Sequence, residues 1–222
     1  VVLLGSYKTP SVEQIIALDP DLVILSADTQ EHVALYDTLV AAGVNPAYFS
    51  VNLFQDYLDA LRLFTSITGR EDLYQQNGEA IQAEIDAAIA RAQGEKTPTV
   101  LFIRAFSSGF RAKGKDSMAG AMLYDLGADN IADRDPSLLE DLSMEAIIAA
   151  DPDFIFVVTM GEDHEKAMAA VRKGLQDNPA WEGLSAVKAG RYHVLPRKLF
   201  HYKPNARWGE SYAYLADILY GE

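Results

Sequence analysis

Residues 11–27 read SVEQIIALDPDLVILSA, and residues 143–159 read SMEAIIAADPDFIFVVT. The two segments are identical at eight of seventeen positions, at a constant offset of 132 residues. Each copy joins a short amphipathic stretch, a turn with proline and an apolar run, which predicts a helix, a turn and a buried strand. The offset is far longer than the roughly 20–50 residues of a solenoid repeat. The duplication therefore predicts two lobes of similar build, an arrangement that commonly binds a ligand between the lobes.

The composition narrows the class of protein. Hydrophobic residues make up 49% of the 222 residues and charged residues 23%, which is ordinary for a soluble globular chain. The net charge of −13 argues against a nucleic-acid-binding surface. There is no cysteine, which excludes disulfides, thiol catalysis and cysteine-based metal sites. No apolar run approaches the roughly 18 residues of a membrane-spanning helix.

Strand and helix patterns alternate along most of the chain, which is typical of parallel sheets. The apolar runs 1–5, 22–25 and 99–104 predict strands. In residues 71–93, isoleucines recur every four residues, which predicts a single helix of about 20 residues. We therefore predict an α/β protein with an N-lobe at 1–70, a linker helix and hinge at 71–96, and a C-lobe at 97–222.

Several further short sequence motifs follow one another along the chain. Gly5 precedes PSVEQIIALDPDLVI at 10–24, and the C-terminal half contains GADN at 127–130, NPAW at 178–181 and LSAVKAGR at 184–191. Together with the second copy of the repeat, these motifs and their order resemble those of the substrate-binding proteins of ABC importers for iron–siderophore complexes, haem and cobalamin. The resemblance covers nearly the whole chain.

The resemblance implies two Rossmann-like lobes with mostly parallel sheets, joined by one rigid helix. It also implies a non-enzymatic, extracytoplasmic protein that delivers an iron complex, a ferric siderophore or haem, to an ABC permease. Such a protein is either free in the periplasm or held at the membrane by a lipid anchor. The N-lobe of the family normally opens with further strand–helix–strand units before the first phrase, so we expect a shortened N-lobe here.

Glu13 and Glu145 occupy equivalent positions in the two copies of the repeat. A glutamate in the first turn of a helix stabilises it by about 0.3–1 kcal/mol through the helix dipole, which is one explanation of both residues. In the family, one surface glutamate on each lobe docks against arginines of the permease. The resemblance therefore implies that Glu13 and Glu145 are docking residues.

Ten of the 19 basic residues lie in two segments without any acidic residue, 104–115 and 188–208. Such clusters suit an anionic ligand held by charge-assisted hydrogen bonds, although some of these charges could simply be solvated on loops. Aromatic side chains near the same segments suit a flat or chelated ligand. The residues expected to bind the ligand are Tyr7, Arg104, Arg111, Lys113, Lys115, Lys198, His201, Tyr202, Lys203 and Arg207.

His201 and Tyr202 are residue types that can ligate haem iron, although a histidine in a loop is more often a plain polar residue. Trp208 shares a predicted C-terminal helix with Tyr212 and Leu215, and is therefore expected in the core. We predict no resident metal site and no cofactor, because the iron is expected to arrive as part of the ligand.

Enzyme motifs are missing from the sequence, including the P-loop, G-x-S-x-G, H-E-x-x-H and G-x-G-x-x-G. We therefore predict no catalytic residues. The alternative is a chelatase-like enzyme acting on a tetrapyrrole on a similar two-lobed fold, which would need a histidine and a glutamate converging on the ligand. A cytosolic scaffold would leave the duplication unexplained.

Overall fold

Both copies of the duplicated sequence form a helix, a turn and a strand in the computed structural model, which describes residues 1–221. In the first copy, α1 (Val12–Ala17) leads to β1 (Val23–Ser26). In the second copy, α10 (Met144–Ala150) leads to β6 (Phe154–Thr159). The local structure predicted for the repeat is therefore confirmed in both places.

The two copies also share their capping details. The hydroxyl groups of Ser11 and Ser143 each accept a backbone N–H bond from the first turn of the helix that follows. Asp19 and Asp151 both have left-handed backbones, with φ of 45° and 37°. Aspartate tolerates this conformation better than most residues do, because its short polar side chain bonds locally. The first aspartate of each Asp-Pro-Asp sequence therefore takes the left-handed conformation at or just after the end of its helix.

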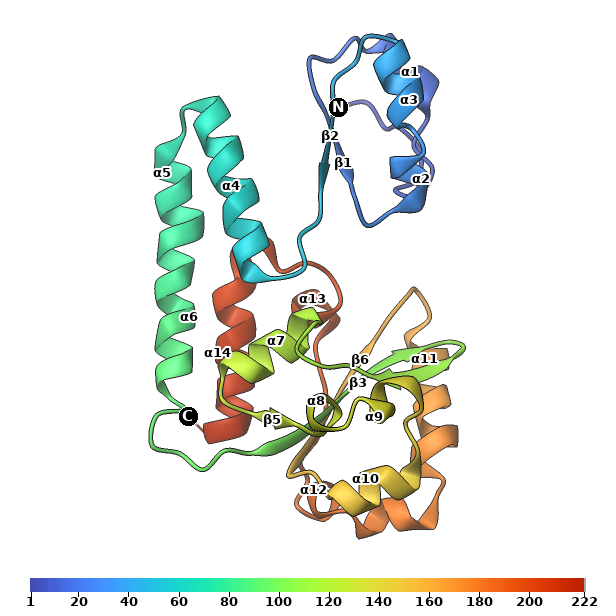
Figure 1. Ribbon diagram of the computed structural model, residues 1–222, viewed down its shortest axis with the longest axis vertical. Helices are drawn as coiled ribbons and strands as arrows, with labels where there is room; N and C mark the ends of the chain where they lie inside the picture. Colours follow the sequence, from blue (N-terminus) through green and yellow to red (C-terminus); the bar gives the residue numbers. More distant parts are fainter. Residues whose placement is uncertain (222) are drawn as a thin grey trace. The chain divides into compact units, whose positions relative to one another are not determined.

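The chain divides between Val51 and Asn52 into two compact units (Figure 1). The sequence pattern places this boundary at residue 70, after α4 (Phe54–Thr68). In the structure α4 belongs to the second unit, because Phe54 is buried there with its ring centroid 5.7 Å from that of Trp208. An amphipathic pattern shows that a helix has a buried face, but it does not show which core that face joins.

The first unit contains a two-stranded parallel sheet in which β1 pairs with β2 (Pro46–Phe49). Its small core consists of Ile15, Leu25, Leu39 and Val44. The other helices of the unit are α2 (Gln30–Val33) and α3 (Tyr36–Ala41).

The predicted strand at residues 1–5 is wrong. Within residues 1–221, the only strand-like pairing of this run is an isolated bridge between Gly5 and Pro10, while the carbonyl of Leu4 accepts a 2.7 Å hydrogen bond from the backbone N–H of Ser11. An apolar run forms a strand only where a neighbouring strand completes its backbone hydrogen bonds.

The second unit contains a five-stranded sheet with the order β4-β3-β6-β7, and β5 also pairs with β3. All pairings are parallel except that of β3 with β4. The strands are β3 (Thr99–Phe106), β4 (Gly109–Ala112), β5 (Asp129–Asn130), β6, and β7 (Tyr192–Val194). The α/β class with mostly parallel sheets is therefore confirmed.

The strand β4 forms in a segment whose sequence shows no strand pattern. Residues 107–112 read SSGFRA, which lacks the apolar alternation of a strand. The strand forms because β3 extends to Phe106 and turns back on itself, with Gly109 at a φ of 147° that glycine adopts readily.

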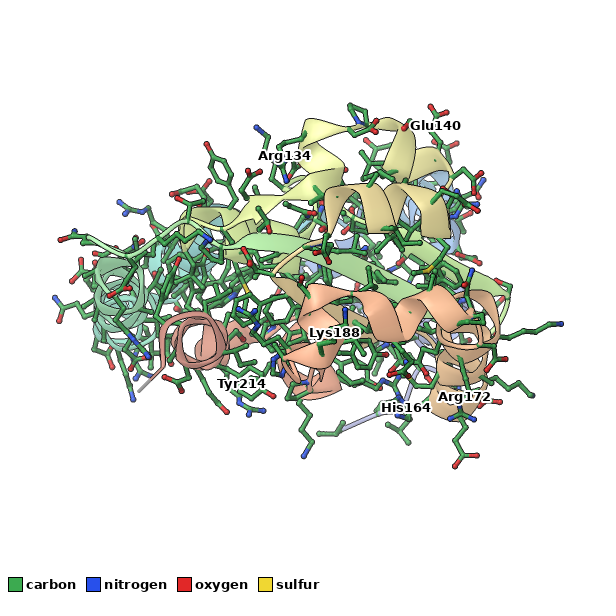
Figure 2. All side chains as sticks on the ribbon, turned by 90° about the horizontal axis from the view of Figure 1, so that it is seen from below. Arg134, Glu140, His164, Arg172, Lys188 and Tyr214 are labelled. Carbon is green, nitrogen blue, oxygen red and sulfur yellow. The ribbon has the colours of Figure 1, made fainter. Side chains whose placement is uncertain are left out.

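Two layers of helices cover the sheet, and side chains fill the space between them (Figure 2). Phe102 of β3 belongs to the core on one side, while Leu101 and Ile103 belong to the core on the other. The first layer contains α6 (Ala80–Ala90), α7 (Met118–Asp125), α13 (Arg197–Phe200) and α14 (Trp208–Tyr220), and the short turn η4 (Asn205–Arg207) precedes α14. The second contains α8 (Ile131–Arg134), α9 (Ser137–Glu140), α10, α11 (His164–Val171), η2 (Arg172–Gln176), η3 (Pro179–Gly183) and α12 (Ser185–Lys188).

The predicted long helix is present, with a π-helical turn inside it. It runs through α5 (Glu71–Tyr74), η1 (Gln75–Glu79) and α6. Its isoleucines Ile81 and Ile85 are buried, and α6 packs along α14 (Figure 1). The sequence pattern assigns this helix to the connection between two lobes, whereas the structure groups the whole of it with the second unit.

No helix within residues 1–221 is both long enough and apolar enough to cross a membrane.

Candidate functional site

The parallel strands of the second unit end side by side. Arg104 of β3 is in register with Val158 of β6, and Val157 of β6 is in register with Val194 of β7. The segments that follow β6 and β7 therefore start at the same edge of the sheet as Arg104. Ligands of open α/β sheets bind at this carboxyl edge.

Arg104 lies on the sheet face that also carries Phe102, because side chains alternate along a strand. Its partner in β4 is Arg111, so two arginines stand opposite each other on that face. Burial lowers the pKa of the Arg104 guanidinium, and the charge of Asp116 offsets part of this effect. The Nε of Arg104 is buried and has no hydrogen-bond partner among the described residues.

Arg197 begins α13, shortly after β7 ends. Its guanidinium donates hydrogen bonds to the carbonyl of Gly161 and, at 3.3 Å, to the hydroxyl of Tyr202. The guanidinium carbon also lies 5.5 Å from the centroid of the Tyr202 ring, in a cation–π contact. Its Nε, like that of Arg104, is buried without a partner in the part of the chain that the structure describes.

His201 follows α13 and is half-buried, with its ring centroid 4.5 Å from that of Tyr202. Burial lowers its pKa, the positive charges of Arg197 and Arg104 lower it further, and Glu162 acts in the opposite direction. A pKa below the usual value leaves the imidazole neutral at pH 7. The His201 Nδ1 is buried and unpaired within residues 1–221.

Arg104, Arg197 and His201 form a group that we call the cationic cluster. Buried polar nitrogens almost always have a hydrogen-bond partner in native proteins, so three unpaired ones at one edge of a sheet call for an explanation. Two guanidinium groups can bind carboxylate, catecholate or phosphate oxygens through charge-assisted hydrogen bonds. The geometry therefore suits an anionic ligand with several oxygen atoms.

The structure brings together only part of the residues that the sequence predicts for ligand binding. Arg104, His201 and Tyr202 meet at the cationic cluster, and Arg111 lies beside Arg104. Arg197 was not singled out by sequence reasoning, although Lys198, Lys203 and Arg207 of the same segment were. Its position directly after an apolar strand and a proline is the signal that could have identified it.

The other predicted residues have neighbours of their own. The Lys115 ammonium lies 5.1 Å from the centroid of the Tyr124 ring, and the Lys203 ammonium donates a 2.9 Å hydrogen bond to Asn52. Arg207 forms a bidentate pair with Glu210. Lys113 is half-buried and Lys198 is exposed. Tyr7 lies in the first unit, where its hydroxyl group is 3.1 Å from that of Thr29.

Glu13 and Glu145 occupy matching positions in the structure, as they do in the sequence. Each stands in the first turn of its helix, α1 or α10, and each is exposed. Both carboxylates are therefore accessible to a partner, and both are also placed to complement a helix dipole.

Trp208 is 1% exposed, which confirms its predicted place in the core. Among residues 1–221, no group of three or more histidine, aspartate or glutamate side chains is arranged to hold a metal ion.

Residues 1–199 match the family model described as periplasmic binding protein. The chain belongs to the periplasmic binding protein family. The resemblance noted from the repeat and its accompanying phrases is therefore confirmed. This family, like the relatives below, consists of binding proteins rather than enzymes, so no comparison supports the chelatase alternative.

Two relatives come from Bacillus subtilis (strain 168). The putative ABC transporter substrate-binding lipoprotein YhfQ is 25% identical, with 86% of this chain and 61% of the relative covered. The probable siderophore-binding lipoprotein YfiY is 28% identical, with 85% and 59% covered. This periplasmic binding protein thus spans about three fifths of the length of these curated relatives.

Solved structures show the same fold. The periplasmic heme-binding protein RhuT from Roseiflexus sp. RS-1, in its apo form, matches with a TM-score of 0.75 and 24% identity. The match covers 98% of this chain and 82% of RhuT. At this level of identity, the likeness supports the fold alone.

Proposed function

We propose that this periplasmic binding protein captures an anionic iron complex, a ferric siderophore or haem, outside the cytoplasm and delivers it to the permease of an ABC importer. Arg104, Arg197 and His201 are the proposed centre of the contact in the second unit. The other residues selected from the sequence remain candidate contacts: Tyr7, Arg111, Lys113, Lys115, Lys198, Tyr202, Lys203 and Arg207.

The observation that carries the proposal is the set of unpaired buried nitrogens in the cationic cluster. A buried donor that lacks an acceptor costs about 1–3 kcal/mol. An anionic ligand would supply acceptors for the Nε–H groups of Arg104 and Arg197, and its binding would therefore remove this cost for both. Ferric catecholates, ferric citrate and haem all present anionic oxygens, so they fit this requirement.

The names of the relatives support the ligand class and the location. YfiY is named as siderophore-binding, and the ferric form of a siderophore is commonly an anionic or neutral iron complex. YhfQ and YfiY are named as lipoproteins, which supports a location on the outer face of the membrane. A soluble periplasmic form fits the same proposal.

The first prediction concerns the charge of the ligand. Titration with haem, a ferric catecholate and ferric citrate, followed by absorbance and intrinsic fluorescence, should show saturable binding of at least one of them. Raising the NaCl concentration from about 0.05 to about 0.5 M should weaken that binding, because salt screens the attraction between the anionic ligand and the half-buried guanidinium groups, although less than for fully exposed charges. A cationic ferric hydroxamate of similar size is the matched control and should bind more weakly. Tighter binding of the hydroxamate would contradict the proposal.

The second prediction concerns docking. Glu13→Ala and Glu145→Ala should each reduce iron uptake about fivefold or more while leaving ligand affinity unchanged, because a lost interfacial charge affects association with the permease. Glu165→Ala is the matched control, since Glu165 is an exposed glutamate in the first turn of α11. Uptake should be measured with radiolabelled iron in cells that carry the cognate permease. Wild-type uptake by both variants would show that Glu13 and Glu145 only stabilise their helices.

A further inference from the structure

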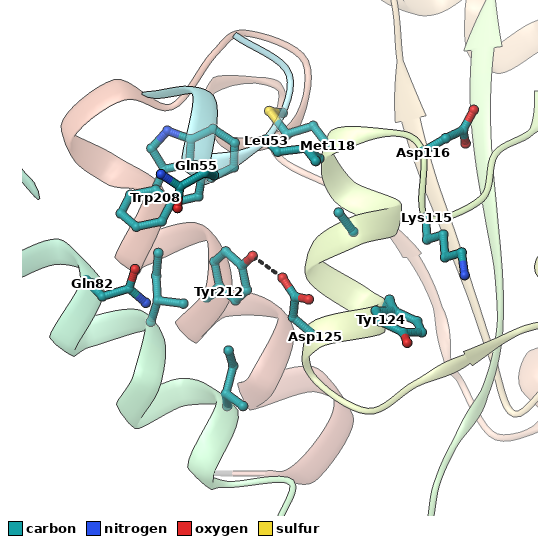
Figure 3. Close-up of a pocket in the computed structure, with 14 residues that line it drawn as sticks. Leu53, Gln55, Gln82, Lys115, Asp116, Met118, Tyr124, Asp125, Trp208 and Tyr212 are labelled. Atoms are coloured by element: carbon teal, nitrogen blue, oxygen red, sulfur yellow. Dashed lines mark hydrogen bonds between the residues drawn. The ribbon is translucent and has the colours of Figure 1, made fainter. Parts of the chain in front are cut away.

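The second unit contains a cavity of about 690 Å³ that the cationic cluster does not line. Figure 3 shows it where the start of α4 meets one face each of α6, α7 and α14. Its volume lies within the range of about 300–1,000 Å³ that is typical of small-molecule sites. All of its lining residues belong to the second unit.

The walls of the cavity are largely apolar and aromatic. From α6, Ile85 and Ile89 face the space, and from α7, Met118 and Ala121 do so. These residues recur at helical spacing, so each helix presents one continuous stripe to the cavity. The remaining aromatic and amide side chains that line this space are Phe54, Gln55, Gln82, Tyr124, Trp208 and Tyr212.

Asp125 brings a negative charge to the solvent-exposed rim of this cavity. Figure 3 shows its carboxylate turned toward Tyr212, whose hydroxyl group donates a 2.6 Å hydrogen bond to one carboxylate oxygen. Burial, and then the bond to Asp125 and its charge, raise the pKa of Tyr212, so the phenol keeps its proton and remains a donor. In the described residues Asp125 forms no ion pair, and its charge is therefore not balanced by a neighbouring cation.

The other charged lining residues do not balance Asp125 either. Asp116 adds a second carboxylate at the edge of the cavity. The Lys115 ammonium lies over the ring of Tyr124, and in Figure 3 both lie on the opposite side of α7 from Tyr212. The space between α6, α7 and α14 thus combines aromatic rings with an unbalanced carboxylate.

We infer that this cavity binds a hydrophobic organic cation, a small molecule with a positively charged nitrogen on an apolar or aromatic body. Its charge would be balanced by Asp125, and its apolar body would lie against Leu53, Ile89 and Ala121, the apolar lining residues that keep exposed surface. The net charge of −13 also favours the encounter with a cation over that with an anion. This site would be separate from the proposed iron-complex site.

The test uses Trp208 as an internal reporter. The chain has two tryptophans, and Trp181→Phe leaves Trp208, in the cavity wall, as the only one. This protein is titrated with benzyltrimethylammonium, and with neutral benzyl alcohol and anionic benzoate as controls. We expect a saturable change in emission and an affinity for the cation that is about tenfold higher than for benzyl alcohol, since the Asp125 carboxylate attracts the charged probe and not the neutral one.

Variants in the same background locate the site. Asp125→Asn should lower the affinity for the cation about tenfold and leave that for benzyl alcohol unchanged, because it removes charge and keeps size. Asp141→Asn, at an exposed aspartate outside the cavity, should change neither affinity. Ala121→Leu should weaken both probes by filling the space. Arg104→Gln should leave the cation unaffected, which separates this site from the cationic cluster.

Several outcomes would overturn the inference. They are the absence of saturable binding to protein with a native circular dichroism spectrum, equal or tighter binding of benzoate, and equal binding of the cation and benzyl alcohol. Unchanged cation affinity in a folded Asp125→Asn variant would do the same. If that variant does not fold, the Ala121→Leu variant and the comparison of the three probes test whether the cavity binds the cation. A Trp208 emission that shifts with protein concentration alone would show that a second copy fills the cavity instead.

Discussion

Replacing Arg104 and Arg197 together with glutamine should weaken the binding of an anionic ferric complex by about a hundredfold or more. Hydrogen bonds to charged groups contribute about 1.5–3 kcal/mol each, and about 1.4 kcal/mol corresponds to a factor of ten. Glutamine keeps a polar side chain of moderate length and removes the positive charge, so the double variant tests charge rather than size. Equilibrium titration with the ligand that wild-type protein binds measures the effect.

The control for this experiment is Arg70→Gln. Arg70 forms an exposed ion pair with Asp72 at 2.7 Å, in the helical segment that begins at α5, and it has no part in the cationic cluster. Its loss changes the net charge without removing a proposed contact, so the affinity should change by less than about threefold. A double variant that binds as tightly as the wild type would refute the role of the cationic cluster while leaving the family assignment intact.

Trp208→Ala should lower the free energy of unfolding of the second unit by about 3–5 kcal/mol, the usual cost of removing a large aromatic side chain from a core. The side chain is 1% exposed and packs against Phe54, so the substitution removes core packing between α14 and α4. Since domains are typically stable by only about 5–15 kcal/mol, this loss is a large part of the total. Urea unfolding followed by far-UV circular dichroism measures it.

Tyr124→Ala is the matched control for the stability experiment. Tyr124 is also an aromatic residue of a helix in the second unit, but its side chain is 58% exposed. Its removal should cost about 0.5 kcal/mol or less, apart from the contact with Lys115. If Trp208→Ala unfolded at the same urea concentration as this control, α4 would not depend on Trp208 for its place in the core.

The local structure of the repeat could be predicted because its causes lie within a few residues of each other. Ser11 and Ser143 cap the helices that follow them, and the Asp-Pro-Asp phrases end those helices. The apolar run of β6 is buried at every position, as a central parallel strand requires. The buried isoleucines of α6 followed from their spacing alone.

The family could also be recognised from the sequence, because the order and spacing of several phrases are preserved over nearly the whole chain. The same phrases do not reveal which ligand is bound. They occupy helix starts and turns, whereas the unpaired nitrogens of Arg104, Arg197 and His201 lie where strands end and α13 begins.

Only the tertiary structure decided which basic residues meet. Arg104 and Arg197 are 93 residues apart in the sequence, and they come together because β3, β6 and β7 pair in parallel with their carboxyl ends at one edge. The strand β4 and the membership of α4 in the second unit were decided in the same way, since both depend on a partner distant in the chain. The sequence by itself determined the elements whose capping, turns and periodicity are local. Pairing and packing determined the rest, because a hydrogen-bonded edge or an apolar face is stable only against the particular neighbour that the folded chain brings to it.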